Sequence, residues 1–427
     1  MRVLMFGWEF PPHITGGLGT ACLGMTRALM QEGVEVTFVL PRLFGQEEPG
    51  GMRLLSASEL GLNLREEEVL FLREHARFLA IDSYLHPYIG QEDLWSERHQ
   101  ERGYELRLHH WREEYFSFSG RYGANLMEEV ARYALLGAVV AQREDFDIIH
   151  AHDWLTYGAG IAAREASGRP LVVHVHATEF DRSGENINQA VYDIERHGMH
   201  AADRVIAVSN RTRETIISRY GVPPERVVTV HNAVDFSGQS LLGPLERPFP
   251  ERVVTFLGRI TFQKGPEYFV EAAHRVLQRM DNVRFVMAGS GNTLHQMVSR
   301  VAQLGMASKF HFAGFLQGED VDTMYRMSDV YVMPSVSEPF GITPLEAMRN
   351  TVPVIISRQS GVAEVLRHAI KVDFWDIDAI ADSIYGILSY RALQRFFQRH
   401  GAEEVKGIQW GQAARRIGDV YEQLCPT

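Results

Sequence analysis

The chain has 427 residues, more than one hydrophobic core usually supports, and two domains are the simplest expectation. Its apolar fraction of 45% and charged fraction of 23% are typical of globular proteins and exclude a disordered or fibrous class. The formal charge of −11 disfavours nucleic acid as the main partner, because phosphate backbones are bound by dense basic surfaces.

Cysteine content and hydropathy predict the compartment. Cys22 and Cys425 are the only cysteines, too few for a disulfide framework, and this fits a reducing compartment such as the cytoplasm. The first residues form a strand-like run without the pattern of a signal peptide, and no run approaches the ~18 apolar residues of a membrane span. No zinc-ligand spacing occurs among the histidines, so we expect no metal.

Short β-rich apolar runs recur along the first half of the chain, separated by segments with helical periodicity. This alternation predicts a parallel sheet covered by helices. The first helix is predicted from Leu18, Cys22, Met25 and Leu29, which recur at spacings of four, three and four, and it should end at Gly33. The predicted strands are 3–6, 34–40, 146–150, 171–175, 205–208 and 227–230.

The strand and helix pattern starts again in the second half, at 253–257, 283–287, 310–312, 330–333 and 352–356. Between 236 and 250 the chain is rich in Ser, Gly and Pro, which places a domain boundary at 240/241. Residues from about 42 to 122 are charged, aromatic and irregular, and we interpret them as an insertion without an assigned role. The sequence therefore predicts an α/β protein with two Rossmann-like, doubly wound domains.

Glycines join the first predicted strand to the first helix. Gly16 and Gly17 would let backbone amides approach a ligand closely, beside the positive end of the helix dipole. Phosphate or sugar hydroxyls are suitable ligands. A tight turn that requires positive φ angles would explain the same two glycines.

Two cations follow the first strand of the second half. Arg259 and Lys264 lie on the loop after 253–257, at the edge of the sheet where open α/β folds bind ligands. Gly289 has the equivalent position after 283–287. Two cations beside a helix start suit a diphosphate, although a solvated pair on an exposed loop is the alternative.

The most specific segment is 334–348, which runs from a strand through a loop into a helix that opens between Gly341 and Pro344. Glu338 lies in the loop and Glu346 in the helix, and carboxylates accept paired hydrogen bonds from sugar hydroxyls. The alternative is that Glu338 caps the helix and Glu346 faces solvent. Free amides that could hold phosphates belong to Phe340, Gly341, Ile342 and Thr343.

Together these motifs closely resemble the retaining glycosyltransferases of the GT-B fold, above all family four, with similarity to the glycogen synthases of family five. The resemblance covers nearly the whole chain. It implies two domains that face a central cleft: residues 1–240 on the acceptor side, residues 241–406 for the nucleotide sugar, and a C-terminal helix at 407–427 that crosses back. The matching segments are 16–19, 149–154, 207–210, 231–235, the Arg259 and Lys264 pair, and the two glutamates.

The resemblance also implies roles for the residues of the second half. Arg259 and Lys264 would stabilise the departing diphosphate, Glu338 would hold the transferred sugar, and Glu346 would bind the ribose hydroxyls. The amides at 340–343 and the backbone of Gly289 would contact the donor.

In the first half, Gly16 and Gly17 would approach the donor. His176 resembles the histidine beside the reacting sugar, with His174 as the competing choice. Asp153 is an acceptor-side candidate.

The implied reaction moves a hexose, with glucose favoured, from an ADP-, UDP- or GDP-sugar to a glycan, without a cofactor or an obligatory metal. Ile14 stands where family five typically carries lysine, which argues against ADP-glucose recognition of the glycogen-synthase type. A transferase of mannose or another sugar to a lipid-linked or small-molecule acceptor is the alternative within the class. A nucleotide-sugar epimerase and a silent carbohydrate-binding protein are the alternatives outside it.

Overall fold

The computed structural model describes residues 1–13, 16–45, 47, 50–59, 126–236, 247 and 249–426. The chain forms two compact units. The first comprises Met1–Val208, Thr212–Val230 and Ala413–Thr427, and the second comprises Ser209–Arg211 and His231–Gln412. The boundary predicted at 240/241 lies outside the described residues, as does most of the predicted insertion at 42–122.

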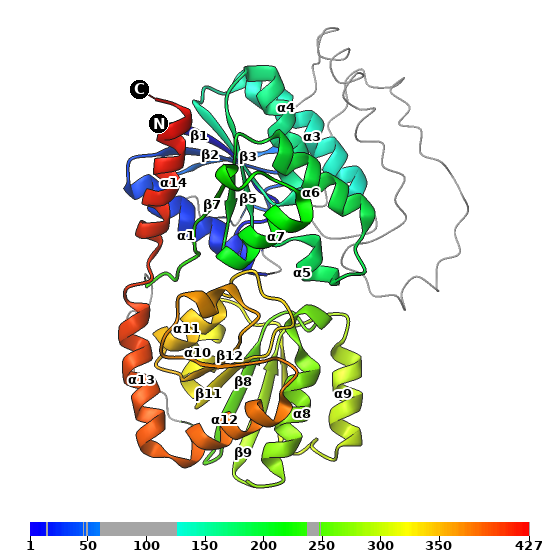
Figure 1. The fold of residues 1–427 in the computed structure, drawn as a ribbon, viewed down its shortest axis with the longest axis vertical. Coiled ribbons are helices and arrows are strands. Elements are labelled where there is room, and N and C mark those ends of the chain that lie inside the picture. The colour runs from blue at the N-terminus through cyan, green and yellow to red at the C-terminus, as the bar shows by residue number, and fades with distance from the viewer. Residues whose placement is uncertain are drawn as a thin grey trace, which may run out of the picture. The chain divides into compact units, whose positions relative to one another are not determined.

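The first unit is built on a seven-stranded parallel sheet with the order β3-β2-β1-β4-β5-β6-β7 (Figure 1). The order grows outward from β1 in both directions, so the sheet is doubly wound and its topological switch point lies between β1 and β4. The strands are β1 (Arg2–Phe6), β2 (Glu35–Leu40), β3 (Arg53–Ser56), β4 (Ile148–His152), β5 (Leu171–Val175), β6 (Arg204–Ala207) and β7 (Val227–Thr229).

Helices cover both faces of this sheet, and Figure 1 shows α1 and α14 to one side of it and α3, α4 and α6 to the other. The apolar core between the sheet and α3 and α4 includes Phe6, Ile149 and Val173. The helices are α1 (Gly17–Gln31), α3 (Leu126–Arg143), α4 (Trp154–Ser167), α5 (Glu179–Ser183), α6 (Gln189–Ala201), α7 (Asn210–Tyr220) and α14 (Trp410–Leu424).

The first helix confirms three of the four predicted apolar positions. Cys22, Met25 and Leu29 are buried on one face of α1, whereas Leu18 is only half-buried, and Gly33, with φ of +84°, follows its end. Among the described helices, none is long and apolar enough to cross a membrane.

The second unit has a six-stranded parallel sheet with the order β10-β9-β8-β11-β12-β13, also doubly wound, with its switch point between β8 and β11. The strands are β8 (Arg252–Leu257), β9 (Val283–Ala288), β10 (Phe310–Gly314), β11 (Val330–Met333), β12 (Val354–Ser357) and β13 (Ile370–Val372). The helices are α8 (Pro266–Leu277), α9 (Leu294–Gln303), α10 (Glu319–Met327), α11 (Thr343–Arg349), α12 (Ile377–Ser389) and α13 (Arg391–Val405).

The α/β class predicted from the sequence is confirmed, since every predicted strand overlaps a strand of one of the two sheets. The interpretation of the segment at 42–122 as irregular is corrected by β3, which lies within it and pairs with β2. β13, which closes the second sheet, was also missed.

Candidate functional site

The switch point of the second unit places two predicted loops side by side. β8 and β11 are parallel neighbours, so the loops that follow them, at 258–265 and 334–342, leave the same edge of the sheet. Arg259 and Lys264 come from the first loop and Glu338 from the second. This is the crevice where open α/β sheets bind ligands.

Glycines let these loops touch backbone to backbone. Gly265 has φ of +63°, and a Cβ atom there would lie 2.1 Å from the carbonyl oxygen of Pro334. At Gly289, with φ of +138°, a Cβ atom would lie 1.9 Å from the carbonyl oxygen of Gly258. No other residue fits either position, so the two glycines fix the path of the loop that carries Arg259 and Lys264.

The central contact of this site is an ion pair. Nζ of Lys264 lies 2.5 Å from Oε2 of Glu338, whose side chain is 7% exposed, and the Ser335 hydroxyl donates to the same oxygen at 3.2 Å. The guanidinium of Arg259 donates to Oε1 of Gln263 at 3.3 Å. The structure thus brings Lys264 and Glu338 into contact and holds Arg259 on the same loop.

The segment after Glu338 is fixed by its neighbour in the sheet. The amide of Glu338 donates to Gln359 at 3.0 Å, and the amide of Val362 donates to Phe340 at 2.8 Å. Gly341 has φ of +99° and lies against the Glu338 side chain, where a Cβ atom would be 3.1 Å from its Cγ. In the described part of the chain, no group accepts a hydrogen bond from the amides of Gly341 or Ile342.

Glu346 lies on α11, which begins at Thr343 with Pro344 in its first turn, as the sequence predicted. Burial raises the pKa of Glu346, the charge of Asp322 adds to this, and Arg349 opposes it. Glu346 is half-buried and its Oε2 atom lies 3.5 Å from the Tyr325 hydroxyl, so it is not the fully solvent-facing residue of the alternative interpretation. Glu338 is not a helix cap either, because the N-cap residue of α11 is Ile342 and no side chain caps it.

The first unit has its own switch point, where Gly16 ends the loop after β1 as the N-cap residue of α1 and Gly17 is the first residue of that helix. Gly16 is extended, with φ of −170°, and a Cβ atom added to Gly17 would meet no atom within 4 Å. Neither glycine is thus explained by a tight turn with positive φ. The buried carboxylate of Glu9, which sequence reasoning missed, accepts a hydrogen bond from the amide of Gly19 at 3.3 Å.

Asp153 follows β4 on the other side of this switch point, in a left-handed backbone conformation with φ of +58°. Its Oδ1 atom accepts hydrogen bonds from the amides of His176 at 2.6 Å and Ala177 at 3.3 Å. Burial raises the pKa of Asp153 to about 7, against the effect of these amides and of Arg182. Asp153 therefore holds the first residues after β5 in place.

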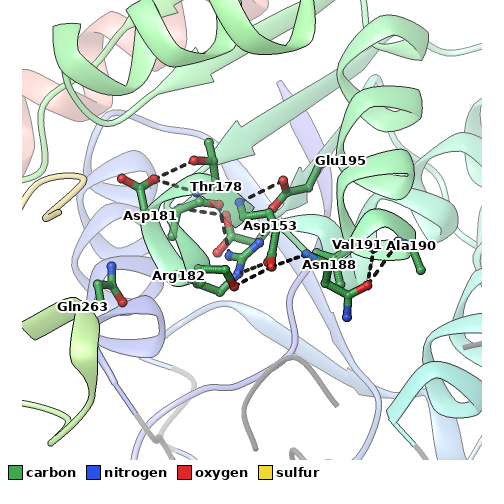
Figure 2. A network of polar contacts seen from close by, with 12 residues as sticks. Asp153, Thr178, Asp181, Arg182, Asn188, Ala190, Val191, Glu195 and Gln263 are labelled. Atoms are coloured by element: carbon green, nitrogen blue, oxygen red, sulfur yellow. Dashed lines mark hydrogen bonds and ion pairs between the residues drawn. The ribbon is translucent and has the colours of Figure 1, made fainter. Parts of the chain in front are cut away.

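A buried ionic network fixes the rest of the loop after β5 (Figure 2). The guanidinium of Arg182, 6% exposed, forms ion pairs with Glu179 at 3.0 Å and with Glu195 of α6. The amide and hydroxyl of Thr178 both donate to Asp181, at 2.9 and 2.8 Å. Burial raises the pKa of Glu195. The sequence did not predict this residue, because it lies in α6 outside every motif.

Histidines occupy one face of β4 and β5. His150 and His152 alternate along β4, and His174 pairs in register with His152. His176 lies just past the carboxyl end of β5, as predicted, whereas its competitor His174 is 2% exposed inside the strand. Burial lowers the pKa of His176 and of His150 to about 3 and that of His152 and His174 well below the ordinary value, so all four imidazoles are neutral at pH 7.

Two family models match the chain. The model described as glycosyl transferases group 1 matches residues 244–403, and that of glycosyltransferase family 4 matches residues 96–237. The first match contains the loops with Arg259, Lys264 and Glu338, and the second contains Asp153 and His176.

Individual proteins are similar over nearly their whole length. An uncharacterized glycosyltransferase of Methanocaldococcus jannaschii is 26% identical, over 99% of this chain and 98% of its own. A glycogen synthase of Mycobacterium tuberculosis is 22% identical, over 99% and 94%. Among solved structures, that of HepE from Anabaena in complex with UDP and glucose has a TM-score of 0.68, with 16% identity over 99% of this chain and 100% of its own, and it supports the fold.

Proposed function

Because this chain belongs to the family-four-like glycosyltransferases of the GT-B fold, we propose that it is a retaining hexosyltransferase that moves glucose from a nucleotide sugar to a glycan acceptor. The observation that carries the proposal is the contact between Lys264 and Glu338 at the switch point of the second unit, with Arg259 on the same loop. A cation and a carboxylate held at 2.5 Å offer groups of both signs to a ligand that has phosphate at one end and hydroxyls at the other.

The donor's diphosphate is the proposed partner of Arg259 and Lys264. Cleavage of the bond to the sugar leaves additional negative charge on the diphosphate, and cations fixed at that position stabilise the transition state more than the ground state. The amides of Gly341 and Ile342 are available to the same phosphates. No metal is required in this scheme, because the protein itself supplies the positive charge.

Hydroxyl recognition is assigned to the two glutamates. Glu338 accepts hydrogen bonds from the transferred sugar, and Glu346 accepts them from the ribose. Thr343, at the start of α11, and the neighbouring Phe340 complete the donor contacts. Gly289 contributes by having no side chain, because any Cβ atom there would displace the Arg259 loop.

The first unit contributes the groups proposed to act on the reacting sugar and the acceptor. His176 is neutral, and because its Nε2 atom lies 3.1 Å from Nδ1 of His152, its Nδ1 atom is the nitrogen left for a sugar hydroxyl. Gly16 and Gly17 leave room for the donor, since open space lies where the Cβ atom of residue 17 would be. Asp153 supports the acceptor side by holding the amides of His176 and Ala177.

Glucose is favoured because a glycogen synthase is similar along nearly the whole chain, and the structurally similar HepE was solved with UDP and glucose. UDP-glucose is the first donor to test, since Ile14 replaces the lysine associated with ADP-glucose use in family five. The low cysteine content favours action in the cytoplasm.

The decisive experiment is a donor screen with the purified protein. ADP-, UDP- and GDP-sugars are incubated with and without glucan, nucleotide release is measured, and NMR of the product determines the anomeric configuration. We expect glucan-dependent nucleotide release from UDP-glucose and an α-linked product from the α-linked donor. Inversion at the anomeric carbon contradicts the retaining assignment. Interconversion of the sugar nucleotide without transfer identifies an epimerase instead.

A further inference from the structure

The histidine face of the first unit contains more imidazole nitrogens than its hydrogen bonds use. His150, His152 and His174 are each at most 2% exposed. Among the described residues, no group donates to or accepts from the Nε2 atom of any of the three. Buried polar atoms are normally paired, and an unpaired one costs about 1–3 kcal/mol. Three such atoms in one cluster therefore indicate a ligand.

The three side chains converge because of the sheet register. His150 and His152 are two residues apart on β4 and share a face, and His174 lies beside His152 on β5. One ligating atom from each side chain lies within 4.8 Å of those from the other two. Tetrahedral zinc bonds of about 2.1 Å place ligand atoms about 3.4 Å apart, so ligand atoms that lie up to 4.8 Å apart must move closer together to bind the ion.

The second ring nitrogen of His150 and of His152 has the kind of partner that metal-bound histidines usually have, whereas Nδ1 of His174 has none among the described residues. Nδ1 of His150 lies 2.5 Å from the Tyr421 hydroxyl, and Nδ1 of His152 lies 3.1 Å from Nε2 of His176. A metal-bound imidazole typically uses its second nitrogen in a hydrogen bond that orients the ring. Both rings thus have Nδ1 in a hydrogen bond and Nε2 unpaired.

We propose that His150, His152 and His174 bind one zinc-class divalent transition-metal ion through their Nε2 atoms. Imidazole is a ligand of zinc, cobalt, nickel and copper, and three imidazoles form a known zinc-binding set. The neutral imidazole is the form that binds metal. The site lies in the first unit and uses none of the residues assigned to the donor.

A second set of possible ligands, Cys22 with His152 and His176, shares one residue with this site. It is less favourable because one of its ligands is a thiol, and burial raises the pKa of the Cys22 thiol, so the thiolate needed for metal binding is disfavoured. The three-imidazole set requires no such deprotonation.

Metal content and metal affinity test the proposal directly. The full chain is purified without a polyhistidine tag from zinc-supplemented medium, and its zinc is measured by mass spectrometry after dialysis. Affinity for Zn²⁺ follows from competition with a chromophoric chelator. We expect one zinc per chain, and about 100-fold weaker binding or more in His174→Gln. The control variant His295→Gln, which changes an exposed histidine of α9, should bind zinc as tightly as the wild type.

A second readout keeps the proposal falsifiable if His174→Gln folds poorly. Co²⁺ bound to the wild-type protein should give the intense visible absorption of a tetrahedral complex, and added Zn²⁺ should abolish it. Wild-type protein that binds neither ion after complete removal of metal would overturn the proposal, as would unchanged affinity in a folded His174→Gln. These readouts do not depend on sugar transfer, so they stand apart from the proposed function.

Discussion

The ammonium group of Lys264 lies 2.5 Å from Oε2 of Glu338, so these two side chains neutralise each other at the switch point of the second unit. Glu338 is almost fully buried, so the burial of its carboxylate depends on the neighbouring ammonium group of Lys264. The contact has consequences for folding as well as for the proposed reaction.

Replacing Lys264 by methionine leaves the Glu338 carboxylate buried without its cation. We expect a loss of about 1–3 kcal/mol in the free energy of unfolding, measured by chemical denaturation, because the lysine is partly exposed and water replaces some of its effect. The double variant Lys264→Met/Glu338→Gln should recover most of this loss. If the losses of the two single variants simply add in the double variant, the pair is not coupled.

Arg259→Ala should affect the reaction far more than the fold. The guanidinium is proposed to stabilise charge on the departing diphosphate, and removing one such group commonly lowers kcat by about 100- to 1,000-fold. Arg275→Ala is the matched control, since Arg275 is exposed on α8 and pairs with Asp378. Normal turnover in a folded Arg259→Ala would remove this residue from the site.

Glu346→Gln should stabilise the protein at neutral and alkaline pH. The pKa of Glu346 is raised in the folded state, so between the unfolded and folded pKa values the folded protein binds more protons, and its stability falls as pH rises. Glutamine cannot ionise and avoids this loss. Thermal unfolding from pH 4 to pH 8 should show no difference between the two proteins at the acid end and a more stable variant above it.

The same substitution should weaken donor binding. Contacts to the ribose persist in the ground state and the transition state, so KM for the donor should rise, by about 10-fold or more, with a smaller change in kcat. A defect in kcat with unchanged KM contradicts the ribose assignment.

His176→Ala should keep its fold, because Asp153 binds the backbone amide of residue 176 and the imidazole loses only its contact with Nδ1 of His152. We expect nucleotide binding to persist and transfer to fall by about 100-fold, measured by calorimetry and by product formation. His311→Ala, which changes an exposed histidine of β10, is the control. Full transfer activity in His176→Ala would exclude a role beside the reacting sugar.

Transfer should survive brief treatment with EDTA, and added Mg²⁺ or Mn²⁺ should not increase it. Arg259, Lys264 and the free amides supply positive charge where other enzymes use a weakly held ion. A buried ion held by three imidazoles is expected to exchange slowly and is therefore left in place by brief treatment. Loss of activity that Mg²⁺ restores would require a metal at the diphosphate.

Local patterns were sufficient to predict much of the fold. Apolar runs such as Leu171–Val175 are buried on both faces in a parallel sheet, and this gives them a continuous hydrophobic pattern. β3 has no such pattern: Arg53 is exposed and Leu54 and Leu55 are only half-buried, because β3 lies at the edge of its sheet. Its position depends on pairing with β2, which periodicity does not report.

For the candidate site too, the sequence predicts where residues lie but not which of them are in contact. The positions of the strand ends predict Arg259, Lys264 and Glu338 at one edge of a sheet. The direct contact between Lys264 and Glu338 also depends on Gly265 and Gly289, which let the backbones approach. The spacing of histidines and cysteines within single segments predicts no metal ligands. The three histidines that we propose as ligands come from two strands, and only the register of β4 against β5 brings them together.

The contact between Tyr421 and His150 joins α14 to a strand of the same unit that lies 271 residues earlier in the chain. A ribosome builds the entire second unit before it reaches Tyr421, so a nascent first unit emerges with this part of its sheet uncovered. Completion of that unit must therefore wait until the residues that follow the second unit have been synthesised. Premature termination or proteolytic trimming near the C-terminus would damage the half of the protein that was synthesised first, and cellular quality control would meet a defect far upstream of the missing residues.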